Sequence, residues 1–139
     1  MGIAVAGCMG RSVSSGSGSS AKPPEITFAY VTVWPHGRAA KSRSYGLPCG
    51  GGGGEFSSGS GTQLFPHARA ACRKLSRLPI GAFAPVPRNV ACTEIYGGPQ
   101  VASVFGRTAG KDFNATFTRT DGCEITRWDR VRFLFPGVR

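Results

Sequence analysis

Short segments in which hydrophobic and polar residues alternate are spread along the chain, and this period of two predicts β-strands. Residues 26–34 are the clearest case, because β-branched and aromatic side chains alternate there up to Pro35. The other segments expected to form strands are residues 43–48, 100–105, 113–118 and 131–135. Residues 100–105 and 113–118 are expected to pair as a hairpin, since Gly106 and Gly110 flank the turn between them.

Residues 62–78 show the spacing of a helix instead. Ala71, Leu75 and Leu78 recur at intervals of four and three residues, and Pro66 suits a first helical turn. Pro79 is expected to end this helix. Together the elements predict an α+β fold, in which an antiparallel sheet of about five strands carries one main helix as an α/β sandwich.

Length and composition limit the class of protein. The chain has 139 residues, which suits one domain and is too short for a doubly wound cofactor-binding fold with a separate substrate domain. It has no run of about 18 apolar residues that would span a membrane. Seventeen Lys and Arg against seven Asp and Glu give a net charge of +10. Glycine and proline together make up 31 residues, 21 and 10, which indicates long loops and at least one linker.

The five cysteines are spaced as disulfide partners rather than as metal ligands. They are Cys8, Cys49, Cys72, Cys92 and Cys123. No two are separated by two residues, and His36 and His67 do not lie at zinc-ligand spacings from them, so no metal site is expected. Four cysteines spread through a small, loop-rich body predict two disulfides and an oxidising compartment. Buried free thiols in a cytosolic protein are the alternative.

The first 24 residues are predicted to be an anchor and a tether. Residues 5–8, Val-Ala-Gly-Cys, have the form of a bacterial lipobox, in which Cys8 would be lipidated, although the charged and apolar regions of a full signal are lacking before it. Serine and glycine dominate residues 9–24. We therefore expect a shortened lipoprotein-like signal and tether over 1–24 and a secreted or extracellular domain over 25–139. Such a domain would contact the membrane only through lipid on Cys8; a free surface thiol or a misplaced start is the alternative.

Catalytic motifs are missing from the sequence. The seven acidic residues form no motif of paired general acid and base, and there is no Gly-x-Ser-x-Gly elbow. His67 and Cys72 are five residues apart, which places them on different faces of the predicted helix. Neither an enzyme nor a bound cofactor is expected.

Residues 90–99 lack the alternation of the segments around them. Cys92 would tie the N-terminal part of this loop, and Pro99 would stiffen its exit. A loop held extended by a disulfide is what a substrate-mimicking protease inhibitor requires, because its conformational freedom has already been lost on folding. An ordinary turn beside a structural disulfide is the alternative.

Several motifs along the chain are together typical of one protein family. They are Gly61-Thr62, Pro66-His67-Ala68, Ala71-Cys72 with Leu75, Cys92-Thr93-Glu94-Ile95-Tyr96 with Pro99, Gly106, Gly110, Cys123-Glu124 and the last predicted strand. With these motifs, residues 26–135 resemble the Streptomyces-type subtilisin inhibitors, small secreted bacterial proteins that block serine proteases.

The resemblance implies disulfides Cys49–Cys72 and Cys92–Cys123 and a scissile bond between Glu94 and Ile95. Glu94 would enter the specificity pocket of the protease. The loop residues implied to contact the protease around that bond are Ala91, Cys92, Thr93, Tyr96 and Gly97. The family is typically homodimeric through its sheet, so a homodimer is also implied.

Two departures from the family bear on activity. Thr93 stands where the family usually has proline, and Gly97-Gly98 replaces the single residue before Pro99, which is expected to soften the exit of the loop and weaken inhibition. Glu94 itself suits a specificity pocket lined by Arg or His, and like-charge repulsion should exclude it from trypsin-like pockets. The expected partner is a serine protease, subtilisin-like or glutamyl endopeptidase-like.

Two other kinds of function remain open. One is a surface-tethered binding domain that keeps the fold without inhibiting. The other is nucleic-acid binding, which is suggested by a basic stripe on the predicted helix. The stripe is formed by Arg69, Arg73, Lys74 and Arg77. Because an exported domain rarely meets nucleic acid, we expect no nucleic-acid partner and read the stripe as a solvated face attracted to anionic lipid or wall polymers.

Overall fold

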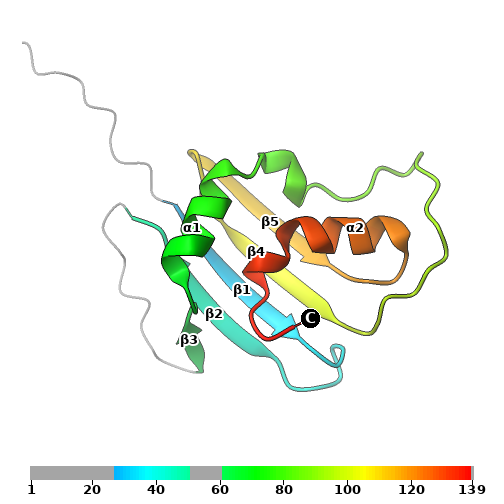
Figure 1. The fold of residues 1–139 in the computed structure, drawn as a ribbon, viewed down its shortest axis with the longest axis horizontal. Helices are drawn as coiled ribbons and strands as arrows, with labels where there is room; N and C mark the ends of the chain where they lie inside the picture. Colours follow the sequence, from blue (N-terminus) through cyan, green and yellow to red (C-terminus); the bar gives the residue numbers. More distant parts are fainter. Residues whose placement is uncertain (1–26, 51–60, 139) are drawn as a thin grey trace, which may run out of the picture.

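The computed structural model describes residues 27–50 and 61–138. Its centre is a five-stranded sheet in the order β3-β2-β1-β4-β5 (Figure 1). The strands are β1 (Phe28–Trp34), β2 (Arg43–Pro48), β3 (Thr62–Leu64), β4 (Val101–Thr108) and β5 (Lys111–Phe117). Cys8, the serine- and glycine-rich tether and most of the glycine run that follows Cys49 lie outside the described residues.

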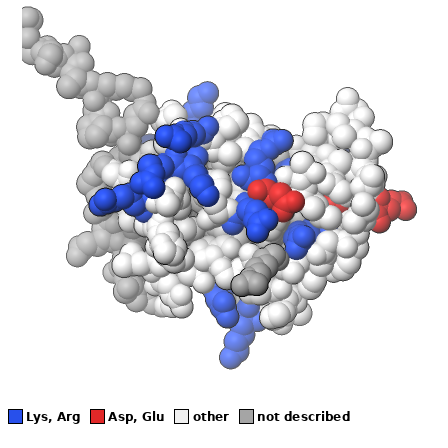
Figure 2. All heavy atoms as spheres, in the orientation of Figure 1, with Lys and Arg blue, Asp and Glu red and all other residues white. Residues whose placement is uncertain are grey.

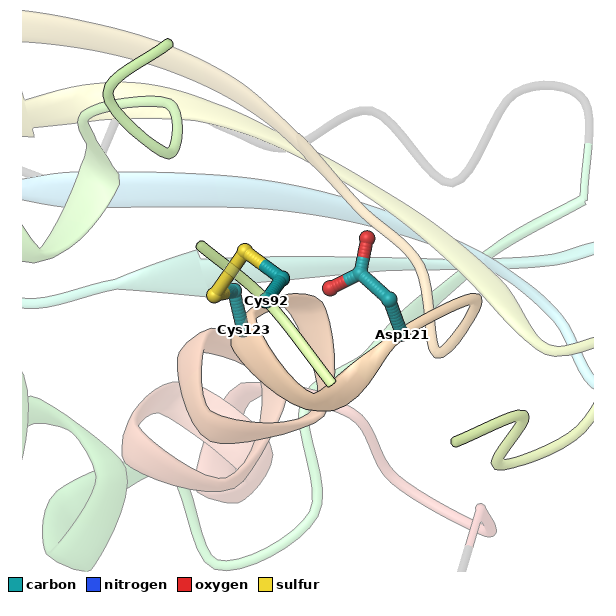
Figure 3. A group of neighbouring side chains, drawn as sticks. All are labelled: Cys92, Asp121 and Cys123. Atoms are coloured by element: carbon teal, nitrogen blue, oxygen red, sulfur yellow. A yellow bond between two sulfur atoms is a disulfide. The ribbon is translucent and has the colours of Figure 1, made fainter. Parts of the chain in front are cut away.

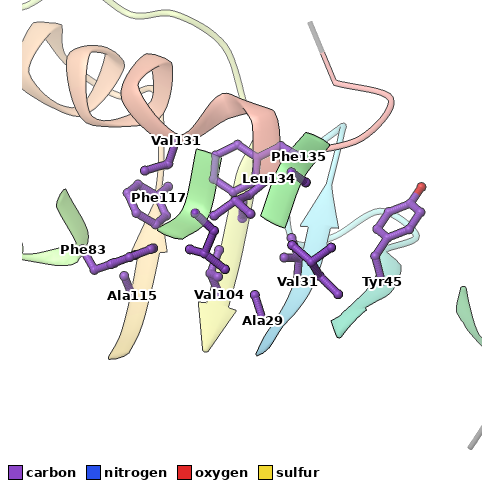
Figure 4. Close-up of a cluster of buried hydrophobic side chains, with 14 of the residues drawn as sticks. Ala29, Val31, Tyr45, Phe83, Val104, Ala115, Phe117, Val131, Leu134 and Phe135 are labelled. Atoms are coloured by element: carbon purple, nitrogen blue, oxygen red, sulfur yellow. The ribbon is translucent and has the colours of Figure 1, made fainter. Parts of the chain in front are cut away.

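One face of the sheet carries the core. The alternation predicted for β1 places Ala29, Val31 and Val33 on this face, all with no exposed surface, and β4 and β5 alternate in the same way. Four helical segments cover the face: α1 (Ala68–Arg77), η1 (Ile80–Phe83), α2 (Gly122–Val131) and η2 (Arg132–Leu134). Figure 4 shows the inward side chains of the sheet meeting those of this helical layer. The fold is therefore α+β, as expected.

The predicted C-terminal strand is wrong. Val131 ends α2 and Arg132–Leu134 form η2 instead, and Val131, Leu134 and the following Phe135 are buried. Val131, Phe133 and Phe135 alternate as a strand would, but Trp128, Val131 and Phe135 also recur at helical spacings of three and four. The segment is helical because this spacing lets Trp128 and Phe135 pack together, with ring centroids 4.5 Å apart.

The predicted helix begins later than expected, and the sheet is not fully antiparallel. Thr62–Leu64 pairs in parallel with β2 as an edge strand, with Thr62 opposite Ser44, so α1 starts only at Ala68. The C-terminal end agrees with the prediction, because Leu78 is extended before Pro79. The sheet is thus mixed, and it carries two α-helices rather than one. Neither is long and apolar enough to cross a membrane, within the residues described.

The turn between β4 and β5 holds a strained alanine. Ala109 and Gly110 both have positive φ, 49° and 71°, as a two-residue hairpin turn with right-handed twist requires. For alanine this backbone conformation costs roughly 1–2 kcal/mol. Asparagine tolerates it better, so Ala109→Asn is expected to stabilise the domain by about 0.5–1 kcal/mol, measured as a higher midpoint of thermal unfolding. Ala84→Asn, at an exposed position with φ −67°, is the control and should give no such gain.

Candidate functional site

The loop before β4 forms one end of the molecule. Residues 90–99 form neither helix nor strand and run along the edge opposite α1 (Figure 1, yellow-green). Six large hydrophobic side chains are exposed in the described part of the chain, and three of them lie in this loop: Val90 (48% exposed), Ile95 (61%) and Tyr96 (66%). Exposed apolar groups gathered in this way are typical of a surface that a partner covers.

Three ties hold the loop against the start of α2 and the segment just before it. The Cys92–Cys123 disulfide joins them with a Cα–Cα distance of 5.4 Å. The Gly122 N–H donates to the Thr93 carbonyl at 2.9 Å, and the Gly97 N–H donates to the Arg119 carbonyl at 2.7 Å. Thr93 and Gly97 lie on either side of residues 94–96, so the exposed tip is fixed at both ends to the same support.

The support is itself well ordered by local interactions. Asp121 caps α2, since its carboxylate accepts a hydrogen bond from the Glu124 N–H at 2.9 Å. Glu124 then pairs with Arg127 at 2.7 Å, one turn further along the helix. An acidic residue in the first turn also interacts favourably with the helix dipole. The residues that receive the loop are therefore held in place before any partner arrives.

Two close contacts show that Gly97 packs tightly against its support, while the expected weakening of inhibition by Gly97-Gly98 stays a prediction. A Cβ atom at Gly97 would lie 2.9 Å from Ile125 Cδ1 and 3.1 Å from Arg119 Cβ. On the other side of the tip, a Cβ atom at Gly122 would overlap the Thr93 hydroxyl. The missing side chains thus let the loop backbone approach its support closely enough for both hydrogen bonds. Gly97 is an anchor of the loop exit, not a flexible spacer.

Glu94 is exposed at the tip and points its charge toward solvent. Within residues 27–50 and 61–138 its carboxylate has no hydrogen bond or ion pair. The loop backbone does not depend on this side chain, so it is available to a partner. Of the residues that the resemblance places in contact with a protease, Ala91, Thr93, Ile95 and Tyr96 are also exposed, and Cys92 and Gly97 are half-buried because they anchor the loop.

The second disulfide lies away from this loop. Cys49 follows β2 and Cys72 lies in α1, and their Cα atoms are 5.4 Å apart. Both pairings are the ones that the resemblance implied. Bonds of this kind are typical of oxidising compartments.

One group of neighbouring side chains has the composition of a metal site. Cys92, Asp121 and Cys123 lie within ligand distance of one another (Figure 3). The two sulfur atoms are bonded to each other, and the Asp121 carboxylate caps α2. A disulfide sulfur is not the thiolate that binds metals, so we assign these three residues to anchoring the loop.

The sequence did not indicate which residues hold the loop in place. Arg119, Gly122 and Ile125 are more than 20 residues from the tip, and nothing in their local pattern marks them as its partners. A signal for α2 itself was present, because Asp121 and Glu124 have the spacing of an N-cap and a following acidic residue.

Comparisons of the chain with protein-family models, with curated proteins and with solved structures found no match. Membership of the subtilisin inhibitor family therefore stays a prediction from the motifs.

Proposed function

We propose that this domain inhibits a serine protease by presenting residues 90–99 as a substrate-like loop, with Glu94–Ile95 as the reactive bond. The observation that carries the proposal is that the exposed tip, residues 94–96, is tied on both sides to residues 119–123. A tip held in this way loses little conformational freedom when it enters a protease cleft. The domain would then bind its partner rather than transform it.

The same ties favour inhibition over simple digestion. If a protease cut the Glu94–Ile95 bond, the disulfide and the Thr93 carbonyl would hold the new carboxyl end. The Gly97 N–H and the start of β4 would hold the new amino end. Because neither end can diffuse away, resealing competes with hydrolysis.

Glu94 is the basis for proposing which protease is inhibited. A carboxylate buried in an apolar pocket is unfavourable unless a cation pairs with it. A pocket lined by Arg or His provides that cation, so we propose a glutamyl endopeptidase-like target, with weaker action on ordinary subtilisins.

A titration of the full chain against subtilisin, trypsin, chymotrypsin and a glutamyl endopeptidase tests the proposal. We expect near-stoichiometric inhibition of the glutamyl enzyme and slow cleavage at Glu94–Ile95. The alternative is a surface-tethered binding domain of the same fold. Rapid cleavage of that bond, or no inhibition of any of the four enzymes by folded protein with both disulfides intact, would favour the alternative.

We also propose that the domain forms a homodimer through the face of its sheet opposite the helical layer. Tyr30 and Phe105 lie opposite each other on that face with ring centroids 5.1 Å apart, and Phe105 is 47% exposed. Phe105→Glu would place like charges at such an interface, and we expect a monomer by light scattering where the unmodified chain gives a dimer. Ile80→Glu, on the helical side of the fold, should not change the mass. A monomeric unmodified chain would contradict this proposal.

For localisation, we propose a secreted domain that the lipobox-like Cys8 would attach to the outer side of a membrane. The support for this is the residue pattern around Cys8 and the presence of two disulfides.

A further inference from the structure

Helix α1 presents cations without counter-charges. Its ten residues include Arg69, Arg73, Lys74 and Arg77, all exposed, and no acidic residue. None of these four side chains forms an ion pair with any residue that the structure describes. Arginines elsewhere do pair: Arg107 binds Asp112 at 2.6 Å and lowers the pKa of that carboxyl through their hydrogen bond. No ion pair within the described chain therefore neutralises the cations of α1.

A second row of cations faces the end of α1. Arg130 and Arg132 lie at the junction of α2 and η2 and, with Lys74 and Arg77, line an open groove of about 400 Å³. Among the described residues that line the groove, Asp129 is the only acidic one. Lys74 lies over the Phe133 ring, with Nζ 5.7 Å from the centroid, so it is placed at the wall of the groove. The lining carries four positive charges against one negative.

We propose that this basic groove, defined by Lys74, Arg77, Arg130 and Arg132, binds a linear phosphate polymer. A chain lying between the two walls can contact cations from both at once, and arginine forms paired hydrogen bonds with phosphate oxygens. Release of the counterions condensed on such a polymer would add to the binding. The proposal does not depend on protease inhibition.

The composition of the groove favours a polymer over a bilayer or a nucleic acid. Helices that lie on bilayers insert apolar side chains beside their cations. None of the large exposed hydrophobic residues of the described chain lines this groove. Binding of single-stranded nucleic acid relies on exposed aromatic rings on which bases stack, and the one aromatic side chain in the lining, Phe133, is half-buried beneath Lys74.

The position of the groove leaves the loop free. Figure 2 shows Lys and Arg gathered over α1 and the middle of this face, while the end formed by residues 90–99 shows no blue. None of the four cations that define the groove belongs to residues 90–99, and only Arg130 also lines a pocket beside Val90, Ala91 and Thr93, within the described residues.

Calorimetric titration of the full chain with long-chain inorganic polyphosphate tests the proposal. The variant K74Q/R77Q/R130Q removes three cations of the groove, and K41Q/R88Q/K111Q removes three exposed cations elsewhere, so both have the same net charge. We expect the groove variant to bind about tenfold more weakly, as loss of three partly exposed ion pairs implies. The logarithm of its binding constant should also fall less steeply with the logarithm of salt concentration, by about 2 in slope. The control variant should bind within about threefold of the unmodified chain.

Three results would overturn the proposal. The first is no binding of polyphosphate by the unmodified chain at physiological ionic strength. The second is equal weakening in both variants, which would mean that net charge alone drives binding. The third is tighter, groove-dependent binding to phosphatidylglycerol vesicles or to oligothymidylate, which would assign the groove to a membrane or to nucleic acid. Unchanged thermal unfolding of both variants would show that folding is intact.

Discussion

Replacing Glu94 with lysine is expected to transfer inhibition from a glutamate-accepting protease to trypsin-like enzymes. Trypsin-like specificity pockets hold a carboxylate, which repels Glu94 and attracts lysine. A buried charge pair that is lost or mismatched costs about 2–5 kcal/mol, so inhibition of each enzyme should change by about 30-fold or more, in opposite directions. Inhibition constants for trypsin and a glutamyl endopeptidase measure the effect.

The structure indicates that this exchange leaves the fold intact. Glu94 is exposed and has no hydrogen bond or ion pair in the described chain, so the unfolding midpoint should not move. Asp129→Lys makes the same change in net charge at an exposed position of α2, far from the loop in sequence and on a different element. That control should not inhibit trypsin. If Glu94→Lys also leaves both inhibition constants unchanged, residues 90–99 are not the surface that the protease recognises.

Removing the Cys92–Cys123 disulfide is expected to convert the inhibitor into a substrate. In the double variant C92A/C123A the carboxyl side of the reactive bond loses its covalent tie to the support and keeps the Thr93–Gly122 hydrogen bond. A cleaved end would then leave the protease, and resealing would no longer compete. We expect fast cleavage at Glu94–Ile95, detected by mass spectrometry. We also expect inhibition to weaken by about 100-fold, equivalent to about 2.7 kcal/mol.

The second disulfide provides a control of matched stability. The two bonds close loops of 31 and 23 residues, so loss of either should destabilise the fold by a similar amount, about 3–4 kcal/mol on loop-closure grounds. C49A/C72A lacks the bond between β2 and α1, far from the loop. At a temperature where both variants are folded, it should still inhibit. Equal loss of inhibition in the two variants would mean that general stability, and not the anchored loop, controls the activity.

Local patterns were sufficient for much of the sheet. β2 has the bounds predicted for it, and β1, β4 and β5 lie within three residues of theirs. In β1, β4 and β5 buried residues alternate with more exposed ones, so the alternation of side chains in the sequence reflects the structure directly. In β2, residues 45–47 are all buried. The alternation of side chains did not predict the structure of residues 131–135, which fit both strand and helix spacings. It also missed Thr62–Leu64, because these three residues form a strand only by pairing with β2.

For the candidate site, the sequence by itself indicated the loop and the four cysteines of the domain, because motif and composition are local properties, and the resemblance to the inhibitor family pointed to Glu94. Only the tertiary structure decided what holds that loop. The hydrogen bonds to Arg119 and Gly122 join segments more than 20 residues apart, and the tight packing at Gly97 depends on Ile125 from α2. The basic groove arose in the same way, since Arg130 and Arg132 meet α1 only after residues 131–134 turn as a helix instead of extending as a strand. Contacts between distant segments follow from how the elements pack, and no periodicity within one segment records them.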